Sequence, residues 1–66
     1  MSNEIKAATI SARCVIATIR ALGMQAENKQ REYLGQSMAY TEDAFVKVIE
    51  EEGLHWNAIV TVLHDY

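Results

Sequence analysis

The sequence predicts an all-α protein, a compact bundle of three or four helices with a long N-terminal helix. Three observations predict this class. The 66 residues include nine alanines and no proline, so the composition favours helix throughout. Apolar residues in the first third recur at alternating steps of three and four. Helix-capping residues and three glycines punctuate the chain. We expect one domain over residues 1–66, with an intertwined homodimer as an alternative arrangement of the same helices.

The chain is too short to gain much stability from its own core. A domain of this size buries only about 60% of the surface that its unfolded chain exposes, and such domains often need a disulfide, a metal or a partner. Cys14 is the only cysteine, so an intrachain disulfide is excluded, and no Cys/His spacing typical of zinc is present. Self-association or a protein partner is therefore the expected source of further stability.

The first helix is predicted to begin at Ser2 or Asn3 as the N-cap, with Glu4 in its first turn. Gly23 is expected to end it, because glycine often follows the last helical residue. Between these points runs a first apolar stripe: Ile5, Ala8, Ala12, Val15, Ile19 and Leu22. Charged side chains interrupt the segment, so we expect neither a secretory signal nor a transmembrane span. With a lone cysteine, these features predict a soluble, cytoplasmic protein.

A second apolar stripe lies roughly opposite the first on the same helix, and a helix that is apolar on two faces must be covered on two sides. The helix is therefore either the buried centre of the domain or presents one face to another chain. Small residues in this stripe allow close approach, so its members are candidates for self-association: Ile10, Cys14, Ala17 and Ala21. Between the stripes lies a basic ridge at seven-residue intervals, which we expect to face solvent: Lys6, Arg13 and Arg20.

The rest of the chain is predicted to be helical as well. A second helix is expected over residues 25–38, weakened by Gly35. Thr41 is a good N-cap for a third helix, and two acids follow it in the first turn, where the helix dipole favours them. Gly53 is expected to end or bend that helix. Residues 55–64 fit a helix or a strand; we favour a helix, because a lone strand would lack a pairing partner.

The stretch VIEEEGLHWNAIVTVL resembles a helix-turn-helix in its spacing. Gly53 would be the turn glycine, and Ile59 and Val62 would be buried residues of the second helix. A recognition helix presents Arg, Lys, Asn or Gln to base edges, with basic neighbours for phosphate. Here an acidic shoulder that would repel phosphate stands directly before it: Glu50, Glu51 and Glu52. We therefore interpret the stretch as a corner between packed helices.

Charge is divided unevenly along the chain. Residues 1–33 carry five basic and three acidic side chains, whereas residues 34–66 carry one basic and six acidic, so the halves carry +2 and −5 and the chain −3. The acidic shoulder is expected at a helix C-terminus, where the dipole favours cations. This mismatch indicates a positive group nearby, and the basic ridge, of the same or another chain, is the candidate.

The sequence shows no catalytic signature, and we predict that the protein is not an enzyme and needs no cofactor. His55 and His64 lie near opposite sides of one helix and cannot share a metal alone. Cys14 has no histidine near it in sequence to act as a base, so core packing is its expected role. Trp56 is expected to anchor the core, or to be an interaction hot spot if it is exposed.

These features favour a small non-enzymatic protein-binding regulator or inhibitor. A phage or mobile-element accessory protein that modulates a host protein is one concrete version. The interaction candidates are Ile10, Cys14, Ala17, Ala21, Glu50, Glu51, Glu52 and Trp56. The expected partners are a second copy, a larger protein, or both, with no membrane. The alternative is a dimeric nucleic-acid-binding regulator that places Lys6, Arg13 and Arg20 on phosphates.

Overall fold

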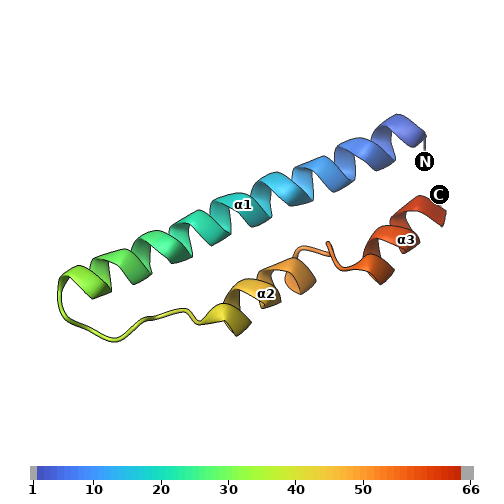
Figure 1. The fold of residues 1–66 in the computed structure, drawn as a ribbon. Coiled ribbons are helices and arrows are strands. Elements are labelled where there is room, and N and C mark those ends of the chain that lie inside the picture. The colour runs from blue at the N-terminus through green and yellow to red at the C-terminus, as the bar shows by residue number, and fades with distance from the viewer. Residues whose placement is uncertain (1, 65–66) are drawn as a thin grey trace.

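Residues 2–64, which the computed structural model describes, form three helices and no strand. They are α1 (Asn3–Tyr33), α2 (Glu42–Glu51) and α3 (Trp56–His64). Figure 1 shows that α2 and α3 follow one another back along α1, so that the start of α1 and the end of α3 lie at the same end of the molecule. The all-α class and the long N-terminal helix are confirmed, and residues 56–64 are helical. We call residues 42–64, which contain α2 and α3, the arm.

The helix α1 is longer than the sequence predicts, because Gly23 does not end it. The 31-residue helix continues to Tyr33, so the separate helix expected over residues 25–38 is wrong. A glycine inside a helix costs about 1 kcal/mol relative to alanine, and favourable residues on both sides outweigh this cost. The helix begins as predicted at Ser2, whose Oγ accepts a hydrogen bond from the Ile5 N–H at 3.2 Å.

Two glycines end α1 and α2 with the same backbone arrangement. Gly35 and Gly53 have φ angles of 73° and 68°, a left-handed conformation that glycine adopts without steric cost. Past α2, the N–H of Gly53 donates to the Glu50 carbonyl at 3.0 Å and the N–H of Leu54 to the Ile49 carbonyl at 2.8 Å. This is the Schellman motif, and it confirms that Gly53 ends the helix.

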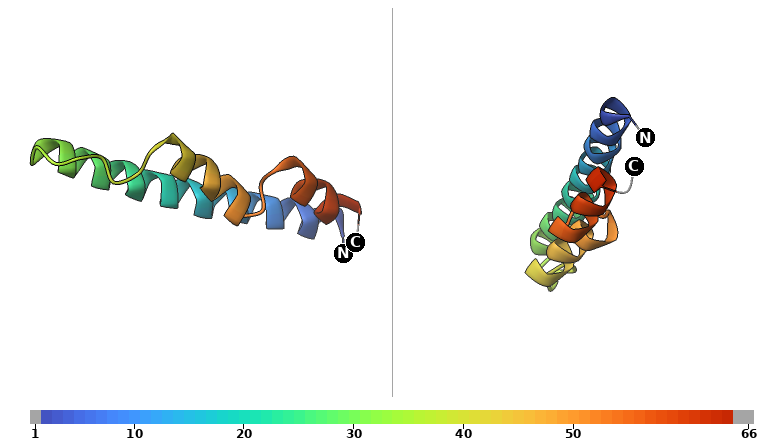
Figure 2. Two further views of the ribbon diagram at one scale, coloured as in Figure 1. Left: turned by 90° about the horizontal axis from the view of Figure 1, so that it is seen from below. Right: turned by 90° about the vertical axis from the view of Figure 1, so that its right-hand side faces the viewer.

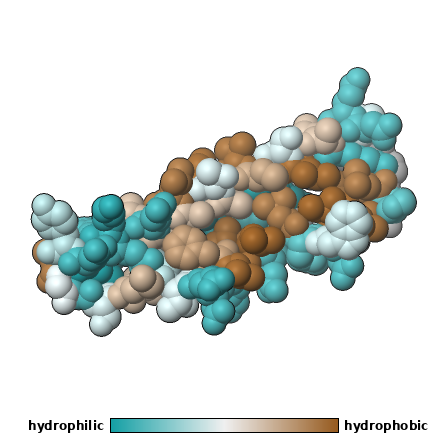
Figure 3. Space-filling model, in the orientation of Figure 1, coloured by the Kyte–Doolittle hydropathy of each residue, from teal (hydrophilic) through white to brown (hydrophobic). Residues whose placement is uncertain are grey.

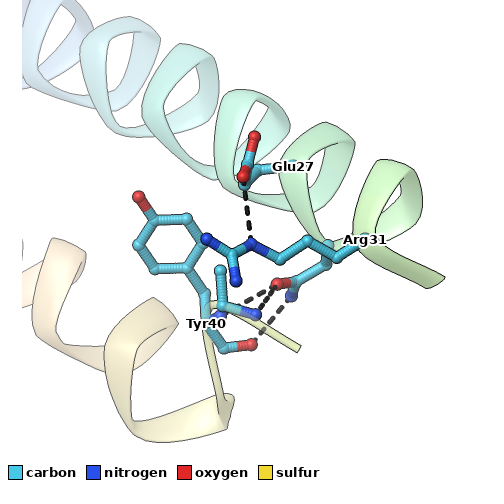
Figure 4. A network of polar contacts seen from close by, with 5 residues as sticks. Glu27, Arg31 and Tyr40 are labelled. Atoms are coloured by element: carbon cyan, nitrogen blue, oxygen red, sulfur yellow. Dashed lines mark hydrogen bonds and ion pairs between the residues drawn. The ribbon is translucent and has the colours of Figure 1, made fainter. Parts of the chain in front are cut away.

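Asn28 holds the connection between α1 and α2 against α1. Its Oδ1 accepts hydrogen bonds from the N–H groups of Ala39 and Tyr40 at 2.9 and 2.8 Å, and its Nδ2 donates to the Tyr40 carbonyl at 2.8 Å. Figure 4 shows this group beside the Glu27–Arg31 pair, whose Oε1 and Nε atoms lie 3.0 Å apart within α1. The connection therefore enters α2 at a fixed point along α1.

The molecule is elongated, and the expected compact bundle is not confirmed. Its principal extents are 49 × 18 × 9 Å, and Figure 2 shows the arm laid along α1 as a second layer. Both α2 and α3 contact α1, and they do not pack on each other within the described chain. The turn at Gly53 therefore joins two helices in line along α1, without the mutual packing of a helix-turn-helix. Val48 and Val62 are the buried apolar residues among 2–64.

Candidate protein-interaction surface

A long exposed apolar feature of the molecule lies along α1, on the side roughly opposite the basic ridge. It contains the whole first stripe and extends past Gly23, because α1 does. We call this set the outer seam: Ile5, Ala8, Ala12, Val15, Ile19, Leu22 and Ala26. All seven side chains are exposed, with Ile5 at 55%, Ile19 at 64% and Leu22 at 58%. A contiguous exposed apolar surface is a feature of protein-binding sites and also of membrane-binding sites.

The outer seam has the spacing of a coiled-coil contact. Its steps alternate strictly between three and four residues from Ile5 to Ala26, which is the 3.5-residue period of a heptad repeat. Next to the middle of the seam lie mainly uncharged residues: Ser11, Thr18 and Gln25 on one side, and Thr9, Ile16 and Gly23 on the other. A second helix can therefore approach the centre of the seam without burying a charge. Continuing the repeat beyond Ala26 places Lys29 in line with the seam.

The second stripe lies on the side of α1 that the arm covers in part. Ile10, Ala17 and Ala21 are half-buried, whereas Cys14 is exposed as a free thiol, so the prediction that it packs in the core is wrong. The arm of the same chain thus occupies much of the surface that the sequence assigns to self-association. The unoccupied apolar surface of α1 is the outer seam instead. The two-sided helix expected from the sequence is present, with one side covered by its own chain.

The basic ridge faces the arm, and the expectation that it faces solvent is wrong. The Lys6 side chain, only 9% exposed, donates from Nζ to the Leu63 carbonyl at 2.8 Å. Arg13 donates from a guanidinium nitrogen to the Gly53 carbonyl at 3.2 Å. These carbonyls lie at or just beyond the C-terminal ends of α3 and α2, where the helix dipole attracts cations. The ridge therefore fastens the arm to α1.

Arg20 completes this set by pairing with the acidic shoulder. Its guanidinium lies 2.9 Å from a Glu52 carboxylate oxygen and 3.2 Å from one of Glu51. The hydrogen bond to Glu52, and to a lesser extent the one to Glu51, raises the pKa of Arg20 above its ordinary value. The positive group that the acidic run predicts is therefore the third member of the basic ridge, in the same chain. Glu50 is exposed.

Trp56 lies at the start of α3 and is 75% exposed, so the prediction that it anchors the core is wrong. It shares the arm with three other exposed apolar side chains: Val46, Ile49 and Leu63. A large exposed aromatic side chain is a common interaction anchor. The arm therefore offers a second, smaller apolar surface. Figure 3 shows apolar side chains gathered in a band along the middle of the molecule, with hydrophilic residues at the end that carries the connection.

The histidines of the arm have structural surroundings. The Nδ1 of His55 accepts a hydrogen bond from the Ala58 N–H at 3.3 Å, as a capping residue does at the first turn of α3. His64 is exposed in the last turn. Within residues 2–64, no three His, Cys, Asp or Glu side chains gather in a group that could hold a metal ion.

An open groove of about 1030 Å³ runs between α1 and the connection, lined in part by Gln25, Met38 and Phe45.

Comparisons with protein families, with curated proteins and with solved structures gave no match for this chain. By length and composition alone, α1 is also apolar enough to cross a membrane, with a mean hydropathy of 1.3 over its most apolar 18 residues. A proposal for the function of this chain therefore rests on its own sequence and geometry. Sequence reasoning identified the first stripe but not its exposure, and it missed the Asn28 contacts. The unbroken three-four spacing through Gly23 to Ala26 was the available signal for the seam.

Proposed function

We propose that the protein is a non-enzymatic protein-binding module that docks through the outer seam of α1. The observation that carries this proposal is a heptad-spaced apolar face, exposed along a helix whose opposite side is already covered by the arm. Such a face is the recognition element of helix-in-groove and coiled-coil complexes. The module would act on a larger protein, or on its own kind, by occupying an apolar helix surface there.

The energetics favour covering the seam. Burying apolar surface stabilises a complex by about 25 cal/mol per Å², and fully burying one large aliphatic side chain contributes about 1.5–3 kcal/mol. Four large aliphatic side chains of the seam are each more than half exposed: Ile5, Val15, Ile19 and Leu22. Since a fold of this size has little stability of its own, docking of the seam would contribute a large share of the total.

Nucleic-acid binding is less well supported, because the basic side chains that it would need are used within the chain. Lys6 and Arg13 donate to backbone carbonyls of the arm, and Arg20 pairs with two glutamates. Releasing them onto phosphates would cost these contacts and detach the arm. The seam itself carries no charge between Ile5 and Ala26. A phosphate backbone would therefore find little to bind there.

We also propose that the module works as a soluble protein in a reducing compartment such as the cytoplasm. Cys14 is an exposed free thiol, which such a compartment preserves. In a membrane-spanning α1, Arg13 and Arg20 would fall within the apolar run, and charges there are costly. Their contacts to the arm would also have to form beside lipid. Separation of cell extracts into soluble and carbonate-washed membrane fractions tests this: recovery in the membrane fraction would contradict it.

Site-specific photo-crosslinking of the full chain in its native cell tests the docking proposal. A benzoylphenylalanine placed at Ile19, in the middle of the seam, is expected to form protein adducts on irradiation. The matched control is the same group at Lys47, which is exposed on α2. Adducts at Ile19 and not at Lys47 would support docking through the seam. Equal adduct yields at the two positions, or none at Ile19, would overturn it.

A further inference from the structure

We infer that the outer seam binds the outer seam of a second copy, with the two α1 helices antiparallel. This inference rests on the proposed function, because it names the first partner of the same surface. Three features of the molecule support it: the shape of the single chain, the order of side chains along the seam and the charge at the end of the seam.

The single chain lacks the shape of an independently stable domain. Its radius of gyration is 15.2 Å, whereas a compact chain of 66 residues has about 11 Å. Its exposed area is 5066 Å², against about 4,200 Å² for a typical folded monomer of 7.4 kDa. The excess, about 900 Å², is close to the roughly 800 Å² that each partner buries in a standard stable interface. A single contact along the length of α1 would therefore bury about as much surface as the excess that the chain exposes.

The order of residues along the seam favours an antiparallel pair. Seam positions whose numbers add to 34 would then face each other, which keeps almost the full length of both helices in contact. Val15 would oppose Ile19 of the second copy, and Ala12 would oppose Leu22, so each large side chain at these layers meets a smaller or comparable one. Interdigitation of large and small side chains is how helix contacts reach the packing density of protein interiors.

A parallel pair would be worse in both volume and charge. Each seam residue would face its own copy, so three layers would hold alanine alone, at Ala8, Ala12 and Ala26, whereas the antiparallel pair has two such layers, where Ala8 faces Ala26. The two Lys29 side chains would also meet at the end of the seam. In the antiparallel pair, Lys29 instead lies beside Ile5 and within reach of Glu4 of the second copy. The antiparallel arrangement thus replaces a like-charge contact with an opposite-charge one.

The resulting dimer would cover α1 on both sides. Each arm would lie on the outside, held by the basic ridge, and the two α1 helices would form the centre. This arrangement satisfies the requirement that a helix apolar on two faces be covered twice. The exposed apolar side chains of the arms, Trp56 among them, would remain free for a further protein.

Disulfide trapping of the full chain tests both the partner and the direction. Cys14 is first replaced by serine, and two single-cysteine variants are made in that background, Ala8→Cys and Ala26→Cys. In the antiparallel dimer, residue 8 faces residue 26 of the second copy, whereas the two residues 8 lie about 27 Å apart along the axis. A mixture in a glutathione buffer is therefore expected to give the mixed 8–26 disulfide at least tenfold above either symmetric product. Predominance of symmetric disulfides would overturn the antiparallel arrangement.

Light scattering across protein concentration separates this inference from the proposed function. A dimer mass that falls to the monomer mass in Ile19→Glu supports the inference; Lys47→Glu is the control that should leave the dimer unchanged. If the native chain is a monomer but the crosslinker at Ile19 captures a foreign protein, the second copy is wrong and the docking function stands. A monomer that gives no protein adduct at Ile19 and binds phosphatidylglycerol vesicles would overturn both, and would assign the seam to a membrane surface.

Discussion

At the scale of single residues, Arg13 and Arg20 of α1 make polar contacts that hold the C-terminal end of α2 against α1. A cation placed at a helix C-terminus is stabilising whether it comes from that helix or from another element. Here the cations come from α1, since the last turn of α2 contains no basic residue. Gly53, just past α2, lies beside Arg13 of α1, so α1 and the end of α2 are in close contact there.

We predict that Gly53→Ala destabilises the protein more than Gly35→Ala. Both glycines have positive φ, so alanine at either position costs about 1–2 kcal/mol. An added Cβ at Gly53 would also lie 2.9 Å from an Arg13 guanidinium nitrogen, whereas nothing lies within 4 Å of one at Gly35. The guanidinium would have to move and weaken its bond to the Gly53 carbonyl. Urea unfolding measures both costs; in an Arg13→Ala background the two should become equal, and a persisting difference would contradict the explanation.

We predict that Arg20→Gln lowers the urea concentration at the midpoint of unfolding. This decrease in stability should be the same from about pH 7 to about pH 10. The raised pKa of Arg20 means that its contribution is fully present below the ordinary arginine pKa and is lost only above it. High salt should shrink the loss, because the pair is partly exposed. Arg31→Gln breaks a pair within α1 alone and should cost less. A loss that vanishes between pH 7 and 10 would contradict the assignment.

At the scale of elements, the position of the arm depends on the connection that Asn28 holds. The position of Asn28 along α1 fixes where α2 begins. The basic ridge can then contact the C-terminal ends of α2 and α3. Without this contact, the arm could slide along an apolar helix face, because apolar contacts are not directional. The polar groups therefore supply the register of the two layers.

We predict that Asn28→Ala destabilises the protein by about 1–2 kcal/mol, since three hydrogen bonds to the backbone of the connection are lost. Asn28→Asp is the matched control. It keeps an oxygen that accepts from the N–H groups of Ala39 and Tyr40, but it replaces the donor to the Tyr40 carbonyl with a second acceptor oxygen. Hydrogen exchange should show faster exchange of those two N–H groups in the alanine variant than in the aspartate variant. Equal exchange in both would show that Asn28 does not hold the connection.

At the scale of the whole molecule, the chain has two apolar layers and very little interior between them. Val48 and Val62 are buried, while large aliphatic side chains of α1 and α2 face outward. In the proposed dimer, folding is linked to association, since burying the outer seam would supply stability that the arm alone does not. The thermal unfolding midpoint of that dimer would depend on protein concentration as well as on sequence.

We predict that the thermal unfolding midpoint of the native chain rises with protein concentration, because unfolding and dissociation are coupled in a dimer of this kind. Ile19→Glu should lower the midpoint and remove its concentration dependence, since a charge would be buried in the seam contact. Lys47→Glu, on α2 and away from the seam, should keep the dependence. Circular dichroism melting curves over a hundredfold concentration range measure this. A midpoint that is independent of concentration in the native chain would contradict association through the seam.

The sequence by itself determined the all-α class and the apolar stripes of α1, and it narrowed the N-cap to Ser2 or Asn3 and placed the end or bend of α2 at Gly53, because each depends on neighbours within a few residues. It also indicated that the acidic shoulder needs a cation nearby. It did not determine that α1 continues through Gly23, which depends on a small balance of propensities. Only the tertiary structure decided which stripe the arm covers and that the basic ridge faces inward. The first stripe carries more large aliphatic side chains than the second, yet long-range polar contacts, such as Lys6 to Leu63 and Asn28 to Tyr40, hold the arm on the side of the second.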